Sequence, residues 1–314
     1  MTFSSEHPIG IIYQHNTQFN PLFDKLVQFG ISFEVIDPAA QLFNPATEKK
    51  RSGLVFADLS SPPYLSQNAL GISQATEYLK QLEKTLDYSN LQVVNGHRVA
   101  EIFASKARQL RLFASLGLHI PATRVVSSSD QLLAAANELR FPILIKNNGL
   151  KEHGPVKRYE SVSQLITALI NNDVQLGGGK TVLLQEYIAS VDSTVVRAEV
   201  LRREVSFARK ISYTWSAEEQ WALEAESSVI DIPYEIERQI ERIAQVIGLD
   251  TGSVEYVVDA QKRVYFYGIG PHTSTSSIKT QGLRFDPNEK LAEFLEEQLV
   301  AARDTGVIDF AKNY

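Results

Sequence analysis

Residues 252–277 read GSVEYVVDAQKRVYFYGIGPHTSTSS, and the rest of the chain is organised around this stretch. Its alternating apolar residues predict two short strands, Ser253–Val258 and Val264–Ile269, joined by a turn. Glu255 lies on the first strand, and the second strand continues into Gly-Ile-Gly-Pro at 268–271. A hairpin that aims an acidic residue at a glycine-opened loop is either an ordinary sheet edge or the floor of a metal–nucleotide site. The remaining sequence has to distinguish these two possibilities.

The composition indicates a soluble globular protein of two domains or three small ones, with 314 residues, 44% hydrophobic and 22% charged. The net charge of −6 argues against a general binder of nucleic acid or anionic membranes, which needs a basic face. Cysteine is absent, which excludes disulfides, thiolate zinc sites and cysteine nucleophiles. We find no targeting segment and no apolar stretch of the ~20 residues that cross a bilayer. We therefore expect a cytoplasmic protein with no nucleic-acid or membrane partner.

The first third of the chain alternates apolar runs with helical patterns. We predict strands at Ile9–Tyr13, Ile31–Ile36, Gly53–Ala57 and Leu91–Val94, and helices at Pro21–Phe29 and Ser66–Leu86. Fully apolar strands separated by helices indicate a parallel sheet covered on both faces. No G-x-G-x-x-G follows the first strand, which argues against dinucleotide binding. One further helix is expected over Val99–Leu116.

The remaining two thirds predict two further α+β units. The first has strands at Thr123–Val126, Phe141–Lys146 and Thr181–Ile188 with capped helices between them. The second begins with antiparallel strands at Thr194–Leu201 and Glu204–Ile211 and a polar segment to Ser228, and it contains helices at Tyr234–Ile247 and Pro287–Ala302. We therefore predict an N-terminal parallel α/β domain over 1–117, a small central α+β domain over 118–188 and a C-terminal antiparallel α+β domain over 189–314.

Several common catalytic motifs are missing or misplaced. Gly177–Thr181 reads GGGKT, but a P-loop needs an earlier glycine at Val174 and must lie between a strand and a helix, in that order. A flexible turn explains it better. The histidines show no zinc-type pairing, and no G-x-S-x-G nucleophile elbow occurs. Triad hydrolysis and histidine–zinc chemistry are therefore not supported.

A series of widely spaced polar residues is more informative. Lys106 lies within the predicted helix, and Lys146 ends the strand FPILIK, where a point charge can meet a phosphate. The strand Gln185-Glu186-Tyr187-Ile188 has an acid, Asp192, just beyond it. Unpaired backbone groups of such a strand can meet a purine ring, and the acid can accept hydrogen bonds from ribose. Taken singly, each of these residues is more often a surface charge or part of a linking strand.

In this order, the elements resemble an ATP-grasp protein of the glutathione synthetase-like or ribosomal-protein glutamate ligase-like kind. The resemblance runs from about Val94 to Pro271 and includes GLHIP at 117–121, FPILIK at 141–146 and the closing strand pair. It implies an ATP-grasp architecture, with the parallel domain first, a central lid domain and an antiparallel C-terminal domain.

The resemblance also implies a role for each candidate residue. Lys106 and Lys146 would contact the α- and β-phosphates under a cover loop at 147–156. The adenine would lie against Gln185, Glu186, Tyr187 and Ile188, largely through their backbone, and the ribose against Asp192. Arg197 and Arg209 would reach the terminal phosphate or an acyl group, unless they are simply charges on the sheet face. Glu255 would hold magnesium, so the implied cofactors are ATP and Mg²⁺.

The closing strand departs from the family pattern. It usually reads E-x-N-P, with an acid and an amide that hold magnesium, whereas this chain has Gly268 and Gly270 at those positions. Magnesium takes one or two carboxylates together with phosphate oxygens and water, so Glu255 alone would hold one ion loosely. Phosphoryl transfer depends on positioning and charge neutralisation, so this loss affects the chemistry more than the fold.

Three functions follow from these observations. The first is an ATP-dependent ligase that activates a carboxylate as an acyl phosphate and joins it to an amine; its partners would be small-molecule carboxylates and amines or a peptide. The second is a non-catalytic homologue that binds nucleotide or a protein partner, which the two glycines favour. The third is an α/β protein whose likeness is structural only. The retained lysines, Asp192 and Glu255 favour at least nucleotide binding.

Overall fold

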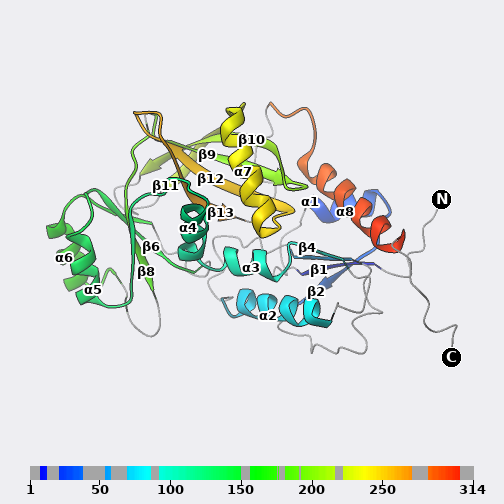
Figure 1. The fold of residues 1–314 in the computed structure, drawn as a ribbon, viewed down its shortest axis with the longest axis horizontal. Helices are drawn as coiled ribbons and strands as arrows, with labels where there is room; N and C mark the ends of the chain where they lie inside the picture. The colour runs from blue at the N-terminus through cyan, green and yellow to red at the C-terminus, as the bar shows by residue number, and fades with distance from the viewer. Residues whose placement is uncertain are drawn as a thin grey trace.

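The computed structural model describes most of the chain and contains three β-sheets (Figure 1). The described residues are 8–12, 21–37, 54–57, 69–85, 92–149, 156–174, 176, 181–190, 192–215, 222–270 and 282–304. The predicted class, a parallel α/β part followed by two antiparallel α+β parts, is confirmed. No helix within these residues is long and apolar enough to span a bilayer.

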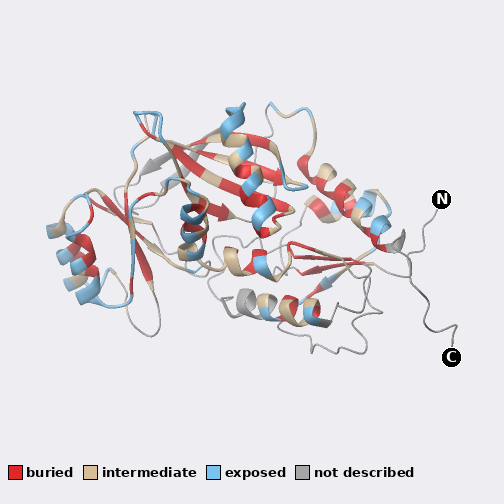
Figure 2. Cartoon of the chain, viewed as in Figure 1, coloured by how far each residue is buried: buried red, intermediate tan, exposed pale blue. Residues whose placement is uncertain are grey.

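The first sheet is parallel, as its uninterrupted apolar strands predicted. Its strands lie in the order β2-β1-β3-β4, with bounds β1 (Ile9–Ile12), β2 (Phe33–Ile36), β3 (Leu54–Ala57) and β4 (Gln92–Val94). The connecting helices are α1 (Pro21–Gln28) and α2 (Ala69–Thr85). Every residue of β1 and β3 is buried, because both strands are central and covered on both faces (Figure 2).

The last described helix, α8 (Pro287–Asp304), returns to this first sheet. It shares a hydrophobic core with α1 and β1, to which it contributes Leu291 and Leu295. The ammonium group of Lys25 on α1 forms ion pairs with Asp286 at 3.0 Å and with Glu289 at 3.2 Å. The N-terminal sheet is therefore completed by the far end of the chain.

The second sheet is antiparallel, in the order β5-β8-β6-β7, with bounds β5 (Thr123–Val126), β6 (Ile143–Asn147), β7 (Lys157–Tyr159) and β8 (Val182–Glu186). Helices α5 (Ser129–Ala136) and α6 (Val162–Ile170) pack on one face, against Ile143, Ile145 and Leu184. Since side chains alternate along a strand, Lys146 and Gln185 lie on the opposite face.

The third sheet is also antiparallel and contains the predicted hairpin. Its order is β11-β10-β9-β12-β13, with bounds β9 (Thr194–Leu201), β10 (Glu204–Trp215), β11 (Ala222–Ile230), β12 (Thr251–Val258) and β13 (Val264–Gly270). Helix α7 (Tyr234–Ile247) packs its apolar stripe on one face, where Ala198 and Val200 of β9 lie. Strand β11 begins in the segment to Ser228 that was predicted only as polar, and its pairing with β10 explains how a polar sequence is held extended at the sheet edge.

The helix predicted over Val99–Leu116 is in fact two helices, α3 (His97–Phe103) and α4 (Lys106–Ser115). Ser105 separates them with an extended backbone (φ −146°), and its hydroxyl accepts a hydrogen bond from the first turn of α4. Serine favours this N-cap position because it satisfies an amide that has no partner within the helix. Lys106 therefore opens a helix rather than lying inside one, which corrects the sequence-based placement.

The division into domains at 117 and 188 stays a proposal. Each of the three sheets is formed within one of the proposed ranges. Helix α8 crosses this division, since it belongs to the third range but packs on the first sheet.

Candidate active site

Four residues from four adjacent strands lie in register across the third sheet. Arg209 of β10 pairs with Arg197 of β9, Arg197 pairs with Glu255 of β12, and Glu255 pairs with Gly268 of β13. Because Ala198 faces α7, the alternation of β9 places Arg197 on the opposite face. We call these four residues the charged row. It places the two predicted arginines and the predicted acid side by side.

Ion pairs join the charged row to a residue that the sequence analysis missed. Arg197 donates from Nη1 to Glu255 at 3.2 Å and from Nε to Glu199 at 3.0 Å. Arg209 donates to the same oxygen of Glu199 at 3.5 Å, and both side chains are only 2% exposed. The sequence signal for Glu199 was its position two residues after Arg197 on a strand, which puts both on one face.

The two glycines of β13 lie against this ion-pair network. A Cβ atom on Gly268 would lie 2.5 Å from a carboxylate oxygen of Glu255. A Cβ atom on Gly270 would lie 3.1 Å from the hydroxyl of Ser253 and 3.5 Å from Nη2 of Arg197. The Glu255 carboxylate therefore lies where a side chain at position 268 would begin, and the Arg197 guanidinium lies in contact with that place at position 270.

The described donors do not fit a pair of magnesium ions. Magnesium needs octahedral oxygen coordination, with carboxylates among the protein ligands. Glu255 is the carboxylate of the charged row, and its charge is already compensated by Arg197. Within the described part of the chain, no group of three or more His, Cys, Asp or Glu side chains is placed to hold a metal ion. His272, a weaker candidate ligand, lies outside the described residues.

Lys106 reaches the charged row from the first position of α4. Burial lowers the pKa of its ammonium group, Arg197 lowers it further, and the negative charge of Glu255 opposes both effects. Both charges act on Lys106 across the short gap between α4 and the third sheet, where Gln109 of the same helix accepts a hydrogen bond from the amide of Ile269. The structure thus brings this predicted phosphate ligand to the predicted acid.

Lys146 approaches from the second sheet. Its ammonium group donates to Oε1 of Gln185 at 2.7 Å and lies 5.1 Å from the centre of the Tyr267 ring on β13. Burial lowers the pKa of Lys146 to about 8, and the like charge of Lys106 contributes, while Glu255 acts in the opposite direction. Two neighbouring ammonium groups with lowered pKa values are a suitable environment for an anion, which would favour the charged form of both.

Asn148 holds the two lysine-bearing elements together. Its carbonyl accepts a 2.8 Å hydrogen bond from the amide of Lys106, and its Oδ1 accepts from the amide of Ala107 at 2.9 Å and from the hydroxyl of Ser105 at 3.2 Å. Its Nδ2 donates to Thr181 beside β8 at 3.0 Å. Asn148 thus supplies two acceptors to the first turn of α4, a role with no sequence signal.

Helix α4 and the linker after it also position β13. Gln109, which is fully buried, accepts a 3.0 Å hydrogen bond from the amide of Ile269, the residue between the two glycines. The amide of Phe266 donates to the carbonyl of His119 at 2.9 Å. The outer edge of β13 is therefore paired with α4 and its linker.

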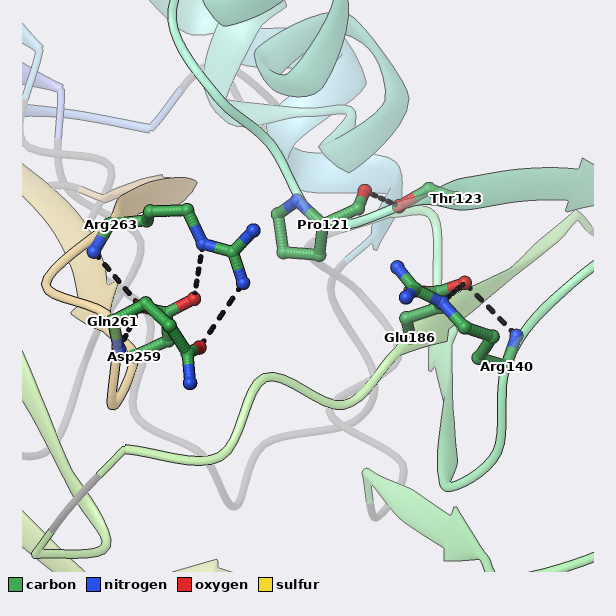
Figure 3. A network of polar contacts seen from close by, with 7 residues as sticks. All are labelled: Pro121, Thr123, Arg140, Glu186, Asp259, Gln261 and Arg263. Carbon is green, nitrogen blue, oxygen red and sulfur yellow. Dashed lines mark hydrogen bonds and ion pairs between the residues drawn. The ribbon is translucent and has the colours of Figure 1, made fainter.

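The predicted adenine-binding strand has its side chains on two faces. Gln185 lies on the lysine face and donates from Nε2 to the hydroxyl of Thr123 at 2.9 Å. Glu186 points to the other face, where the amide of Arg140 donates to it at 3.0 Å and the guanidinium at 3.3 Å (Figure 3). The carboxylate of Glu186 therefore serves the structure of the second sheet.

Two backbone amides of this strand already have partners. Glu186 donates to the carbonyl of Ala122 and Tyr187 to that of Pro142, both at 2.9 Å. These amides are not the unpaired groups that the sequence analysis expected to meet a purine.

Asp192 is found in an ion pair outside the charged row. Lys210 donates to its carboxylate at 2.6 Å, and this hydrogen bond lowers the pKa of Asp192. The side chain of Asp192 is 57% exposed. Nearby, the hairpin turn is fixed by Asp259, which accepts from the amide of Arg263 at 2.9 Å and from its guanidinium at 2.7 Å (Figure 3). An isolated bridge joins Asp259 to Ser190, just before Asp192.

Residues 150–155 of the predicted cover loop and Gly177–Lys180 lie outside the described part of the chain. Ile188, the last residue of the predicted adenine strand, is partly buried.

A family model for the RimK-like ATP-grasp domain matches residues 104–295, which is more than half of the chain. This match includes every candidate residue named above. No curated protein matched the sequence.

Solved structures share the fold over nearly the whole chain. An ATP-grasp RimK domain protein from Sphaerobacter thermophilus DSM 20745 is 19% identical, covers 91% of this chain and 98% of its own, and has a TM-score of 0.65. D-cycloserine synthetase DcsG is 18% identical, and the match covers 93% of this chain and 99% of the synthetase chain with a TM-score of 0.65. The ATP-grasp ligase PsnB, complexed with minimal precursor, Mg and ADP, is 15% identical, with 95% and 99% covered and a TM-score of 0.64.

Proposed function

This chain belongs to the RimK-like ATP-grasp family, and from that premise we propose that it is an ATP-dependent ligase that joins a carboxylate to an amine. The observation that carries the proposal is the convergence of four cations on one place. Lys106 and Lys146 come from α4 and the second sheet, and Arg197 and Arg209 come from the third sheet. Such an arrangement suits a polyphosphate and the charge that develops during phosphoryl transfer.

The proposed reaction has two steps. A carboxylate oxygen of the substrate attacks the γ-phosphorus of ATP, and the bond between that phosphorus and the oxygen bridging to the β-phosphate breaks. ADP departs, and the substrate becomes an acyl phosphate. The nitrogen of the amine then attacks the acyl carbon, inorganic phosphate leaves, and the nitrogen loses a proton to give an amide. Lys106 and Lys146 would hold the α- and β-phosphates, and Arg197 and Arg209 would stabilise the transferred phosphoryl group and the acyl phosphate.

The nucleoside would lie along the second sheet. In this proposal Gln185 faces the nucleotide beside Lys146, Tyr187 and Ile188 flank the adenine, and Asp192 contacts the ribose after exchanging its bond with Lys210. The contact between Gln185 and Lys146 at 2.7 Å supports the first of these assignments.

The substrates would be a small carboxylate and an amine, or a peptide. The peptide option is supported by fold neighbours whose structures hold precursor peptides, such as the macrocyclase MdnC bound with the precursor peptide MdnA. A cytoplasmic location, where ATP is plentiful, is part of the same proposal.

The ligase proposal is tested by ADP release with pools of carboxylic acids, amino acids and peptides. We expect release that depends on both a carboxylate and an amine, and a loss of at least about a hundredfold in Lys146→Met, as for removal of one electrostatic stabiliser. Lys290→Gln on α8, far from the site in the fold, is the matched control and should match the parent protein. ADP release that is equal in Lys146→Met and the parent would contradict the proposal.

The second candidate function is nucleotide binding without turnover, and the two glycines of β13 favour it. It predicts a thermal shift with ATP, with about 2.7 kcal/mol of stabilisation at a hundred times the dissociation constant. It also predicts no ADP release with any substrate pool, so the two measurements together separate the candidates.

A further inference from the structure

We propose that this protein binds its nucleoside triphosphate without a divalent metal, with the Arg197 guanidinium supplying the positive charge beside Gly268 and Gly270. This inference rests on the nucleotide binding in the proposed function, and it specifies the ionic form of the ligand, the metal-free triphosphate.

The geometry supports an arginine in place of a metal ion. Nη2 of Arg197 lies 3.5 Å from where the side chain of residue 270 would begin, and its Nη1 lies 3.2 Å from Glu255. The Glu255 carboxylate in turn lies over Gly268. A metal ion bound by Glu255 would lie beside the positive charge of the guanidinium that holds Oε1, and neither glycine offers a ligand to compensate.

The charges of the side chains at this place favour an anionic ligand. The side chains that meet here are four cations, Lys106, Lys146, Arg197 and Arg209, and two carboxylates, Glu199 and Glu255. Among the described side chains at this place, the net charge is therefore two positive before any ligand binds. Both the free triphosphate and its magnesium complex are anionic, so this excess attracts a polyphosphate in either form, and the coordination geometry decides between them.

Backbone conformation leaves both glycine positions open to substitution. Neither Gly268 nor Gly270 has the positive φ that favours glycine. The atom closest to a Cβ at 268 is the far end of the flexible Glu255 side chain. A metal-binding strand can therefore be rebuilt on this backbone, which provides a direct test.

The experiment is calorimetric titration of the full-length protein with ATP, once with excess EDTA and once with magnesium chloride. For the parent protein we expect the two dissociation constants to agree within about fivefold. In the double variant Gly268→Glu/Gly270→Asn, we expect magnesium to tighten binding by more than about fivefold. The matched control, Gly268→Ala/Gly270→Ala, adds the same Cβ atoms without ligand oxygens and should stay insensitive to magnesium.

Arg197→Gln gives an independent measurement if the double variant does not fold. It removes the guanidinium and releases Glu255, so we expect weaker binding in EDTA by about tenfold or more, partly recovered with magnesium. Unchanged affinity of this variant in EDTA would overturn the inference.

Two further outcomes are distinguishable. Parent protein that binds ATP with magnesium but loses fivefold or more of its affinity in EDTA overturns the inference and leaves the proposed function standing. Absence of ATP binding under both conditions overturns the proposed function itself.

Discussion

The backbone amide of Lys106 donates to the backbone carbonyl of Asn148, so the two lysine-bearing elements are joined at their main chains. The side chain of Asn148 adds hydrogen bonds to Ser105 and Ala107. In effect, the residue that follows β6 accepts hydrogen bonds from the first amides of the helix that presents Lys106. The separation of the two lysines is therefore set by this contact.

Asn148→Ala should weaken nucleotide binding without removing any charge. We expect about tenfold lower ATP affinity, because the variant loses the side-chain caps and loosens α4 relative to the second sheet, at a stability cost of ~1–2 kcal/mol. Isothermal titration and urea unfolding measure the two effects. Asn137→Ala, at an exposed helix end in the same unit, is the control and should change neither by much. Equal ATP affinity in both variants would contradict the role assigned to Asn148.

ATP affinity should fall as pH rises through about 8, the pKa of Lys146. Above this pH the lysine of the free protein loses its proton, and at pH 9 about a tenth of the protein molecules keep Lys146 charged. ATP binding should therefore weaken by about tenfold between pH 7 and pH 9. Lys106, Glu255 and Tyr267 are the other titratable groups around it. Lys146→Arg keeps its charge and should flatten the profile.

Because Lys146 gains or loses a proton, both ATP binding and folding stability should depend on pH through it. Bound phosphate should return the pKa of Lys146 toward its ordinary value of 10.5, so binding near pH 9 should take up a proton, measurable by calorimetry in buffers of different ionisation enthalpy. The folding stability of the free protein depends on pH in the opposite direction to ATP affinity. Because the unfolded chain binds more protons between pH 8 and 10.5, this site contributes stability that rises with pH across that window.

Glu199→Gln should destabilise the free protein by ~3 kcal/mol, because it removes the buried negative charge that Arg197 and Arg209 share. Urea unfolding measures this loss. ATP should restore part of it and give a larger thermal shift than in the parent protein, since the phosphates supply negative charge. Glu204→Gln, at the exposed start of β10, is the control. A stability equal to that of the parent would show that Glu199 does not balance the two arginines.

Substitutions of the neighbouring residues Gln185 and Glu186 should have very different effects on ATP affinity. Gln185→Leu removes the contact to Lys146 and should weaken ATP binding by about tenfold, or ~1.4 kcal/mol. Glu186→Gln changes a side chain that faces Arg140, so it should alter stability and leave ATP affinity close to that of the parent. Equal losses of affinity in the two variants would show that the strand faces the nucleotide differently.

Much of the fold was predictable because it depends on local periodicity. Four apolar runs, with helices after the first and the third, sufficed for a parallel sheet, and the alternation of 253–269 sufficed for the hairpin. The break at Ser105 was missed because the apolar pattern continues across it, although serine is a strong N-cap. Strand β11 was missed because its polar sequence owes its extended form to pairing with β10.

The candidate site was predictable residue by residue but not as an arrangement. Lysines, arginines and Glu255 were singled out from their contexts and from the family resemblance. The alignment of the two arginines with Glu255 across the third sheet depends on pairings between strands, which no local pattern specifies. The partners that fix these groups, Glu199, Asn148 and Gln109, carry no motif and became visible only with the contacts.

The ion pair between Lys25 and Glu289 joins residues 264 positions apart, and the core around it unites α1 with α8. During synthesis the chain must therefore be extended through α8 before this face of the first sheet can be covered. Such long-range closure slows folding, and it leaves apolar strands exposed to other chains while translation proceeds. The first sheet to be made is thus among the last to be finished, and chaperones that bind nascent apolar segments would meet it first.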